Sequence, residues 1–267
     1  TKSGISQRVM RQIVENLFEE IQNNLQEVLS DELCNTYQLL EKNSALKTIH
    51  FPQSQEDLAR AQYRMKFEEL FFVQLQLGLK KYHRKQRIKG IAFPKIEYYF
   101  NSFFHNHLPF PLTEAQKRVV REIRTDLNSG AQMNRLLQGD VGSGKTIVAV
   151  LCMLIALDNN MQATLVAPTE ILAQQHYNSI QSLLAPLGIE IGLLTGSVTK
   201  KEREPLFKKL ANGQLQMLIG THAILEEPVS FHQLGLAIVD EQHRFGVAQR
   251  AKLWRKNDTP PNILVMT

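Results

Sequence analysis

The stretch Gly139-Asp140-Val141-Gly142-Ser143-Gly144-Lys145-Thr146 decides the fold of this chain of 267 residues. Its Gly-x4-Gly-Lys-Thr spacing follows the apolar pair Leu136-Leu137 and precedes a helix-like segment, which is the context that a phosphate-binding loop requires. The glycines allow a tight turn that directs successive amides at phosphate oxygens, and the helix N-terminus adds partial positive charge. A chance glycine-rich turn is the alternative, and the strand–loop–helix context disfavours it.

The chemistry of this loop assigns roles to its last two residues. Lys145 is expected to reach the β and γ phosphates of a nucleoside triphosphate, and Thr146 to ligate Mg²⁺. About a hundred residues later, an apolar run ends in Asp240-Glu241. Because consecutive strand residues face opposite ways, we expect Asp240 to face the magnesium and Glu241 to face the attacking water. The alternative is an acidic strand end in solvent.

Gln116 has two interpretations. Its amide has one donor and one acceptor face, so it suits both hydrogen-bonding edges of adenine. Thr113 and Gln116 also have the spacing of a capping box, which would engage the same side chain locally. The spacing alone does not decide between the two.

From residue 109 onward, short apolar runs alternate with amphipathic segments of helical length. This alternation predicts an α/β domain with a mainly parallel, buried sheet. The expected strands are 135–138, 163–167, 190–194, 216–220, 236–239 and 262–266, and the expected helices are 113–128, 144–158, 169–184 and 199–211.

The first 108 residues have helical periodicity, so we expect an all-α region at 1–108 and the α/β domain at 109–267. We predict a helix over 5–29, a shorter one over 31–42, an extended segment at Ile49-His50-Phe51-Pro52, and a long helix from Ser54 to about residue 86. Ser54 and Asp57 have capping spacing.

The composition excludes several classes of protein. Apolar residues make up 43% of the chain, which is enough for a core, and the net charge of +5 permits nucleic-acid binding without demonstrating it. No apolar run is long enough for a membrane span, and no signal peptide is recognisable. Cys34 and Cys152 are expected to be reduced thiols in a cytosolic protein. The first residue is Thr1, so we expect a fragment.

Several short motifs occur in an order that resembles superfamily 2 helicases. After the phosphate loop come Ala167-Pro168-Thr169-Glu170, Thr195-Gly196, Gly220-Thr221-His222 and Asp240-Glu241-Gln242-His243-Arg244-Phe245-Gly246-Val247. The phosphate loop and the last stretch resemble the RecG family of branched-DNA helicases in particular. The transcription–repair coupling translocases share many of these motifs. The stretches 49–52 and Phe67-Glu68-Glu69-Leu70-Phe71 resemble the RecG helical linker, and the second stretch, with its helical setting, favours that family.

The resemblance implies a RecA-like lobe that uses ATP and Mg²⁺ to act on stalled forks and Holliday junctions. It implies that Gln116 reads adenine, that Thr146 and Asp240 hold Mg²⁺, and that His243 couples nucleotide to DNA. The implied partner is branched duplex DNA. We expect the protein to be a monomer in the bacterial cytoplasm, associated with the nucleoid. The implied DNA track comprises Pro168, Thr169, Glu170, Thr195, Gly196, Thr221 and His222.

The chain's last residues, Val265-Met266-Thr267, resemble the start of the family's Thr-Ala-Thr motif. We therefore expect a second motor lobe and a wedge domain to lie outside this sequence. Alone, the fragment is expected to bind nucleotide weakly and to hydrolyse it slowly or not at all. A non-catalytic nucleotide-binding or DNA-docking module is the alternative, and Glu241 argues against it.

Two further clusters have open interpretations. A basic run, Lys80, Lys81, Arg84, Lys85, Arg87 and Lys89, suits either a DNA-backbone contact or a solvated helix C-terminus, and we favour the latter. An aromatic cluster, Tyr98, Tyr99, Phe100, Phe103 and Phe104, suits either core packing, which we favour, or base stacking.

Overall fold

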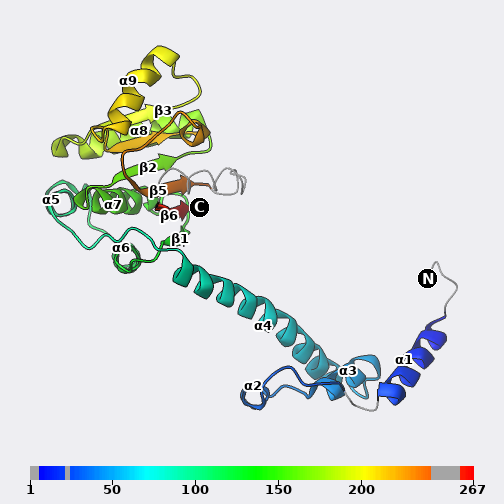
Figure 1. The fold of residues 1–267 in the computed structure, drawn as a ribbon. Helices are drawn as coiled ribbons and strands as arrows, with labels where there is room; N and C mark the ends of the chain where they lie inside the picture. Colours follow the sequence, from blue (N-terminus) through cyan, green and yellow to red (C-terminus); the bar gives the residue numbers. More distant parts are fainter. Residues whose placement is uncertain (1–5, 22–24, 242–258) are drawn as a thin grey trace. The chain divides into compact units, whose positions relative to one another are not determined.

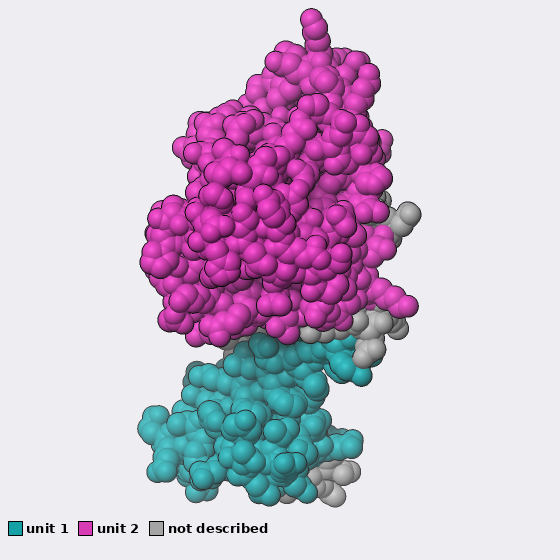
Figure 2. Space-filling model, turned by 90° about the vertical axis from the view of Figure 1, so that its left-hand side faces the viewer, with its two compact units in different colours: residues 1–83 teal, residues 84–267 magenta. Residues whose placement is uncertain are grey.

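The computed structural model describes residues 6–21, 25–241 and 259–267 and, of residues 84–87, only the backbone. The chain divides into two compact units, residues 1–83 and residues 84–267 (Figure 2). The functional division that the sequence predicts after residue 108 stays a prediction.

Unit 1 is built from helices. Helix α1 spans Gln7–Ile21, α2 spans Asp31–Thr36, α3 spans Lys42–His50, and α4, Gln55–Arg87, begins in this unit (Figure 1). Ser54 caps α4 as predicted, because its Oγ accepts the N–H of Asp57 at 3.0 Å. The long helix predicted from residue 54 to about residue 86 is therefore confirmed.

A buried arginine organises unit 1. The side chain of Arg64 is fully buried, and its guanidinium donates to Glu27 at 2.6 Å, to Glu68 at 2.7 Å and to the carbonyl of Leu40 at 2.9 Å. Lys42 lies 3.3 Å from the other oxygen of Glu68. Since a buried charge is costly unless it is paired, these partners explain why an arginine is tolerated there.

The helix predicted over 5–29 is wrong over residues 25–29. Helix α1 ends at Ile21, and residues 25–30 are not helical. The Glu27 carboxylate accepts the N–H groups of Val28 and Leu29 at 2.9 and 3.0 Å, and the Asn43 amide pairs with both backbone groups of Leu25. Side chains thus satisfy backbone groups that a continued helix would have paired.

Helix α2 is also shorter than the predicted 31–42. It ends at Thr36 because Gln38 adopts a left-handed conformation with φ of 50°. The N–H of Leu39 then donates to the carbonyl of Cys34 at 2.9 Å, which is the closing bond of a Schellman motif.

Helix α3 was not predicted. Ile49 and His50 are its last residues, so the extended segment expected at 49–52 is wrong at its start. Pro52 lacks the N–H that a continuing helix would need.

Unit 2 contains a six-stranded parallel sheet in the order β1-β6-β5-β2-β4-β3 (Figure 1). Each predicted strand and each predicted helix of this domain is confirmed to within two residues at either end. The strands are β1 (Asn134–Leu137), β2 (Gln162–Val166), β3 (Ile191–Leu194), β4 (Met217–Gly220), β5 (Leu234–Asp240) and β6 (Asn262–Met266), and the principal helices are α6 (Glu114–Leu127), α7 (Lys145–Asp158), α8 (Glu170–Leu184) and α9 (Lys200–Ala211).

Both faces of the sheet are covered by apolar side chains. Leu236 and Ile238 of β5 belong to one buried cluster together with α6, α7 and α8, and Ala237 and Val239 belong to another together with Leu210 of α9. Burial on both faces explains the continuous apolar runs in the sequence. The predicted fold class, an α/β P-loop domain preceded by helices, is confirmed.

The aromatic cluster before α6 contributes to this core. Phe103 is fully buried, and Tyr99, Phe100 and Phe104 pack against the first apolar cluster, as the core-packing interpretation predicts. Tyr98 is 64% exposed, so the core-packing interpretation is wrong for this residue. This cluster spans the short helix α5 (Tyr98–Ser102) and a π-helical turn (Phe103–His107).

Two observations bear on the composition. Cys34 and Cys152 are both free thiols. Among the helices that the structure describes, none has the length and apolar character needed to cross a membrane.

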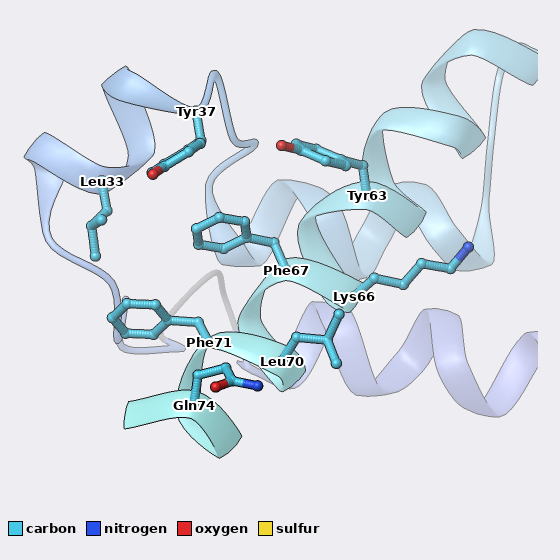
Figure 3. A pocket seen from close by; sticks show the side chains of 8 residues that line it. All are labelled: Leu33, Tyr37, Tyr63, Lys66, Phe67, Leu70, Phe71 and Gln74. Carbon is cyan, nitrogen blue, oxygen red and sulfur yellow. The ribbon is translucent and has the colours of Figure 1, made fainter. Parts of the chain in front are cut away.

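A pocket of about 400 Å³ in unit 1 is lined in part by residues of one sequence motif. Phe67, Leu70 and Phe71, from the stretch that resembles the RecG linker, line it together with Tyr37 and Tyr63 (Figure 3). Glu68 of the same stretch pairs with Arg64. The motif therefore combines an aromatic surface with the buried ion pair that organises the unit.

Candidate nucleotide site

The phosphate loop connects β1 to α7. Gly142 and Gly144 have φ of 81° and 78°, in the left-handed region that other residues rarely adopt. Gly144 is the N-cap of α7, and the N–H of Gly139 donates to the carbonyl of Thr267, just beyond β6. The two left-handed residues turn the chain as an anion-binding loop requires, in front of the partial positive charge of a helix N-terminus.

Lys145, the first residue of α7, lies against this loop. Its ammonium donates to the carbonyls of Gly139 at 2.5 Å and of Asp140 at 3.0 Å. The ammonium is thereby held beside the loop amides, so its positive charge adds to the partial positive charge of their N–H groups. The predicted contact of Lys145 with phosphate suits this position and stays a prediction.

The acidic pair lies at the same edge of the sheet as the loop. Asp240 ends β5 and is opposite Met266 of β6, which in turn is opposite Leu137 of β1. Strand β6 is therefore the only element between the loop and the carboxylate in the sheet order. Asp240 is 9% exposed. Ligands of parallel α/β sheets bind at this carboxyl edge.

Glu241 is placed by a turn and not by strand alternation. It follows the last residue of β5, and it has φ of 51°, an unusual value for a residue other than glycine. Its N–H donates to the carbonyl of Met266 at 2.9 Å. The alternation from which we expected opposite facings therefore does not apply to Glu241. Such strained backbone is concentrated at functional sites.

Gln116 forms the capping box and also contacts the phosphate loop. Its Oε1 accepts the N–H of Thr113 at 2.9 Å, and its Nε2 donates to the carbonyl of Ser143 at 2.9 Å. An amide nitrogen has two N–H groups and an amide oxygen two lone pairs, so each atom has capacity for one more partner. The capping box is therefore compatible with adenine contact, which stays a prediction.

The donor set at this edge fits Mg²⁺. Thr146 supplies a hydroxyl at the start of α7, and Asp240 supplies a carboxylate. Mg²⁺ is usually bound by one or two protein oxygens together with substrate phosphates and water, without a dedicated protein cage. In the part of the chain that the structure describes, no group of three or more His, Cys, Asp or Glu side chains could hold a metal ion.

Sequence reasoning missed one residue of this site. His176 of α8 lies with its Nε2 3.0 Å from Oδ2 of Asp240. The available signal was helical phase, because His176 shares the buried face of α8 with Ala173 and Ile180. A histidine on an apolar face needs a polar partner, and only the fold identifies that partner as Asp240.

The predicted DNA track follows the carboxyl ends of β2, β3 and β4. Thr169 caps α8, and the carboxylate of Glu170 accepts the N–H of Ser197 at 3.2 Å. Arg203 of α9 donates to the carbonyls of Thr195 and Gly196 at 3.1 and 3.2 Å. The loops after β2 and β3 are thus tied together at the same edge as the phosphate loop.

Individual track residues differ in accessibility. Pro168 is half-buried and His222 is exposed, whereas Thr195 and Thr221 are buried. The Thr221 hydroxyl has no hydrogen-bond partner within the described residues. The predicted DNA contacts of all these residues stay predictions.

Two sets of predicted residues fall partly outside the described structure. His243 and the rest of 242–258 lie outside it, and so does the coupling role predicted for His243. Of the basic run, Lys80, Lys81 and Lys89 are exposed, while the side chains at positions 84, 85 and 87 are not described.

The DEAD/DEAH box helicase family model matches residues 113–267, more than half of the chain. The chain belongs to the DEAD/DEAH box helicase family.

Within that class the chain is similar to RecG. It is 45% identical to the ATP-dependent DNA helicase RecG of Synechocystis sp. over 243 residues, covering 91% of this chain and 29% of that protein. It is 40% identical to RecG of Bacillus subtilis over 269 residues, covering 100% of this chain and 39% of that protein. A solved structure of RecG bound to a three-way DNA junction matches with a TM-score of 0.77 and 40% identity, over 99% of this chain and 35% of that one.

These matches confirm the resemblance to RecG that the motifs indicated. The chain spans 29% and 39% of the length of the two curated relatives. A structure of the helicase MrfA, 19% identical with a TM-score of 0.51 over 65% of this chain, shares the fold alone.

Proposed function

We propose that this chain is the helical linker, residues 1–108, and the first RecA-like motor lobe, residues 109–267, of an ATP-dependent DNA helicase. The whole protein would translocate on duplex arms and remodel stalled forks and Holliday junctions in recombination and repair. The observation that carries the proposal is the sheet register, which leaves only β6 between the phosphate loop and Asp240. The likeness to RecG supports branched DNA as the substrate.

At the nucleotide site, each residue has a proposed task. Loop amides and Lys145 bind the phosphates, Gln116 contacts adenine, and Glu241 orients the attacking water. Thr146 and Asp240 would hold Mg²⁺, which when bound neutralises charge that develops on the phosphates. Because this is one lobe of a two-lobed motor in our proposal, we expect the chain by itself to bind nucleotide weakly and to hydrolyse it slowly or not at all.

At the DNA site, residues 168–170, 195–196 and 221–222 form the track. Hydroxyls and backbone amides suit phosphate oxygens without reading sequence, as a motor that moves along DNA requires. His243 would couple the two sites. We further propose that the protein acts as a monomer in the bacterial cytoplasm, at the nucleoid.

The DNA-binding half of the proposal is tested with the exposed residue His222. The experiment measures the affinity of the chain for a fluorescent three-way junction and for a linear duplex at several salt concentrations. We expect salt-dependent binding that His222→Ala weakens by about fivefold, the equivalent of ~1 kcal/mol for one phosphate contact. His232→Ala, at another exposed histidine of the same unit, is the matched control.

Two results would contradict the DNA-binding proposal. One is the lack of measurable binding to either DNA at low salt. The other is an equal loss of affinity in the two histidine variants, which would mean that position 222 has no particular place in the track.

A further inference from the structure

Helix α8 begins in the predicted DNA track and reaches the nucleotide site. Its N-cap Thr169 and first residue Glu170 belong to the track, and His176 lies on the face that packs against the sheet. His176 Nε2 is 3.0 Å from Oδ2 of Asp240, and these side chains are 15% and 12% exposed. The two residues are 64 positions apart in the chain, so the contact is made by the fold.

The direction of this hydrogen bond follows from the chemistry of the two groups. An ionised carboxylate only accepts hydrogen bonds, so the imidazole N–H donates to Asp240. That bond restrains rotation of the carboxylate about its terminal torsion, which is otherwise broad. Among the contacts that the structure describes, His176 holds one oxygen, Oδ2, and Oδ1 is left for the shell of a metal ion.

A role in apolar packing alone does not explain why position 176 is a histidine. Ala173 and Ile180, which flank His176 on the same face of α8, are fully buried apolar residues. A leucine of similar volume would continue that face equally well. It would also remove a partner from a carboxylate oxygen that has little access to water, which is costly.

We propose that His176 is a positioning residue for Mg²⁺, which orients the carboxylate of Asp240 by donating a hydrogen bond to it. The inference rests on the proposed function, because it concerns the same nucleotide site. Partners that hydrogen-bond a metal-ligating group typically change metal affinity by about 10- to 100-fold when they are removed. The expected effect of His176 therefore lies in the Mg²⁺ dependence of nucleotide binding.

The test compares two substitutions of similar size in the 267-residue chain. His176→Leu removes the donor, and His176→Gln keeps an N–H at similar reach. Gln174→Leu is the matched control, because the Gln174 amide is exposed on α8 and donates to Asn178. Binding of fluorescent ADP is followed while Mg²⁺ is titrated, and again in excess chelator, and thermal unfolding verifies that each variant is folded. His176→Ala replaces His176→Leu if the latter does not fold.

We expect His176→Leu to raise the Mg²⁺ concentration for half-maximal binding by about 10- to 100-fold. Affinity in chelator should stay within about twofold, and His176→Gln and Gln174→Leu should titrate like the wild type. Unchanged Mg²⁺ dependence in His176→Leu, or equal defects in the Leu and Gln variants, would overturn the inference alone. A wild-type chain without Mg²⁺-dependent nucleotide binding would overturn the proposed function, and the inference with it.

Discussion

Gly144 is the position at which a single added methyl group should disturb the phosphate loop most directly. Its φ of 78° is left-handed, and a Cβ built there would lie 2.4 Å from Nε2 of Gln116. Forcing an L-residue into this region costs roughly 1–2 kcal/mol. The Gln116 side chain would also have to move away.

The displacement of Gln116 adds a second cost. Its amide would lose the bonds to Ser143 and Thr113, each 2.9 Å long. At about 0.5–1.5 kcal/mol per net hydrogen bond, this adds roughly 1–3 kcal/mol. Gly144→Ala should therefore lower the free energy of unfolding by about 2–5 kcal/mol in total.

The chain offers a matched control at Gly130. Its φ of 71° is similarly left-handed, but a Cβ there meets nothing within 4 Å. Gly130→Ala should cost only the backbone part, about 1–2 kcal/mol. In a Gln116→Ala background, Gly144→Ala should fall to the same range, which gives a double-mutant coupling of about 1–3 kcal/mol.

Urea unfolding followed by circular dichroism measures these differences. The reasoning would be refuted if Gly144→Ala and Gly130→Ala cost the same, or if the cost of Gly144→Ala did not depend on residue 116.

Three further predictions concern the rest of the chain. Asp158→Ala should destabilise unit 2 by about 2–4 kcal/mol in urea unfolding, because the buried carboxylate accepts three backbone N–H groups at the start of α5; a loss below ~1 kcal/mol would argue against this. Burial raises the pKa of Glu27, but backbone N–H groups and Arg64 together lower that pKa by more, so it lies below its ordinary value; the stability that the Glu27 carboxylate contributes is therefore present above the ordinary carboxyl range and is lost as pH falls. Unfolding of Glu27→Gln should accordingly depend less steeply on acid pH than that of the wild type, and equal slopes would count against it. Burial raises the pKa of the Cys152 thiol to about 12, so iodoacetamide near neutral pH should modify Cys34 first and Cys152 only in denaturant; rapid labelling of native Cys152 would contradict its burial.

The α/β domain was predictable because its strands are buried on both faces and connect to helices through short loops. Each strand therefore appears as an apolar run that ends in a motif, and the carboxyl-edge rule places those motifs together. The phosphate loop and Asp240 both follow this pattern, because each comes at the end of such an apolar run.

The parts that could not be predicted depend on contacts between residues distant in sequence. The non-helical conformation of residues 25–30 depends on Glu27, which bonds Lys42 and Arg64, 15 and 37 positions away. Local periodicity has no information on such pairs. The same holds for His176, whose partner is 64 positions away. The orientation of Glu241 could not be predicted either, because its left-handed backbone ends the alternation of strand residues from which that orientation was expected.

The central claim, that this chain binds a nucleoside triphosphate through its phosphate loop, is tested most directly by calorimetric titration with ATP and Mg²⁺. Lys145→Ala removes the ammonium held beside the loop, and Lys117→Ala removes an exposed ammonium that pairs with Glu114. We predict saturable binding by the wild type and by Lys117→Ala, and a loss of about 10- to 100-fold in Lys145→Ala, the equivalent of one charge-assisted hydrogen bond. Equal affinity in wild type and Lys145→Ala, or no binding by the wild type, would contradict the account.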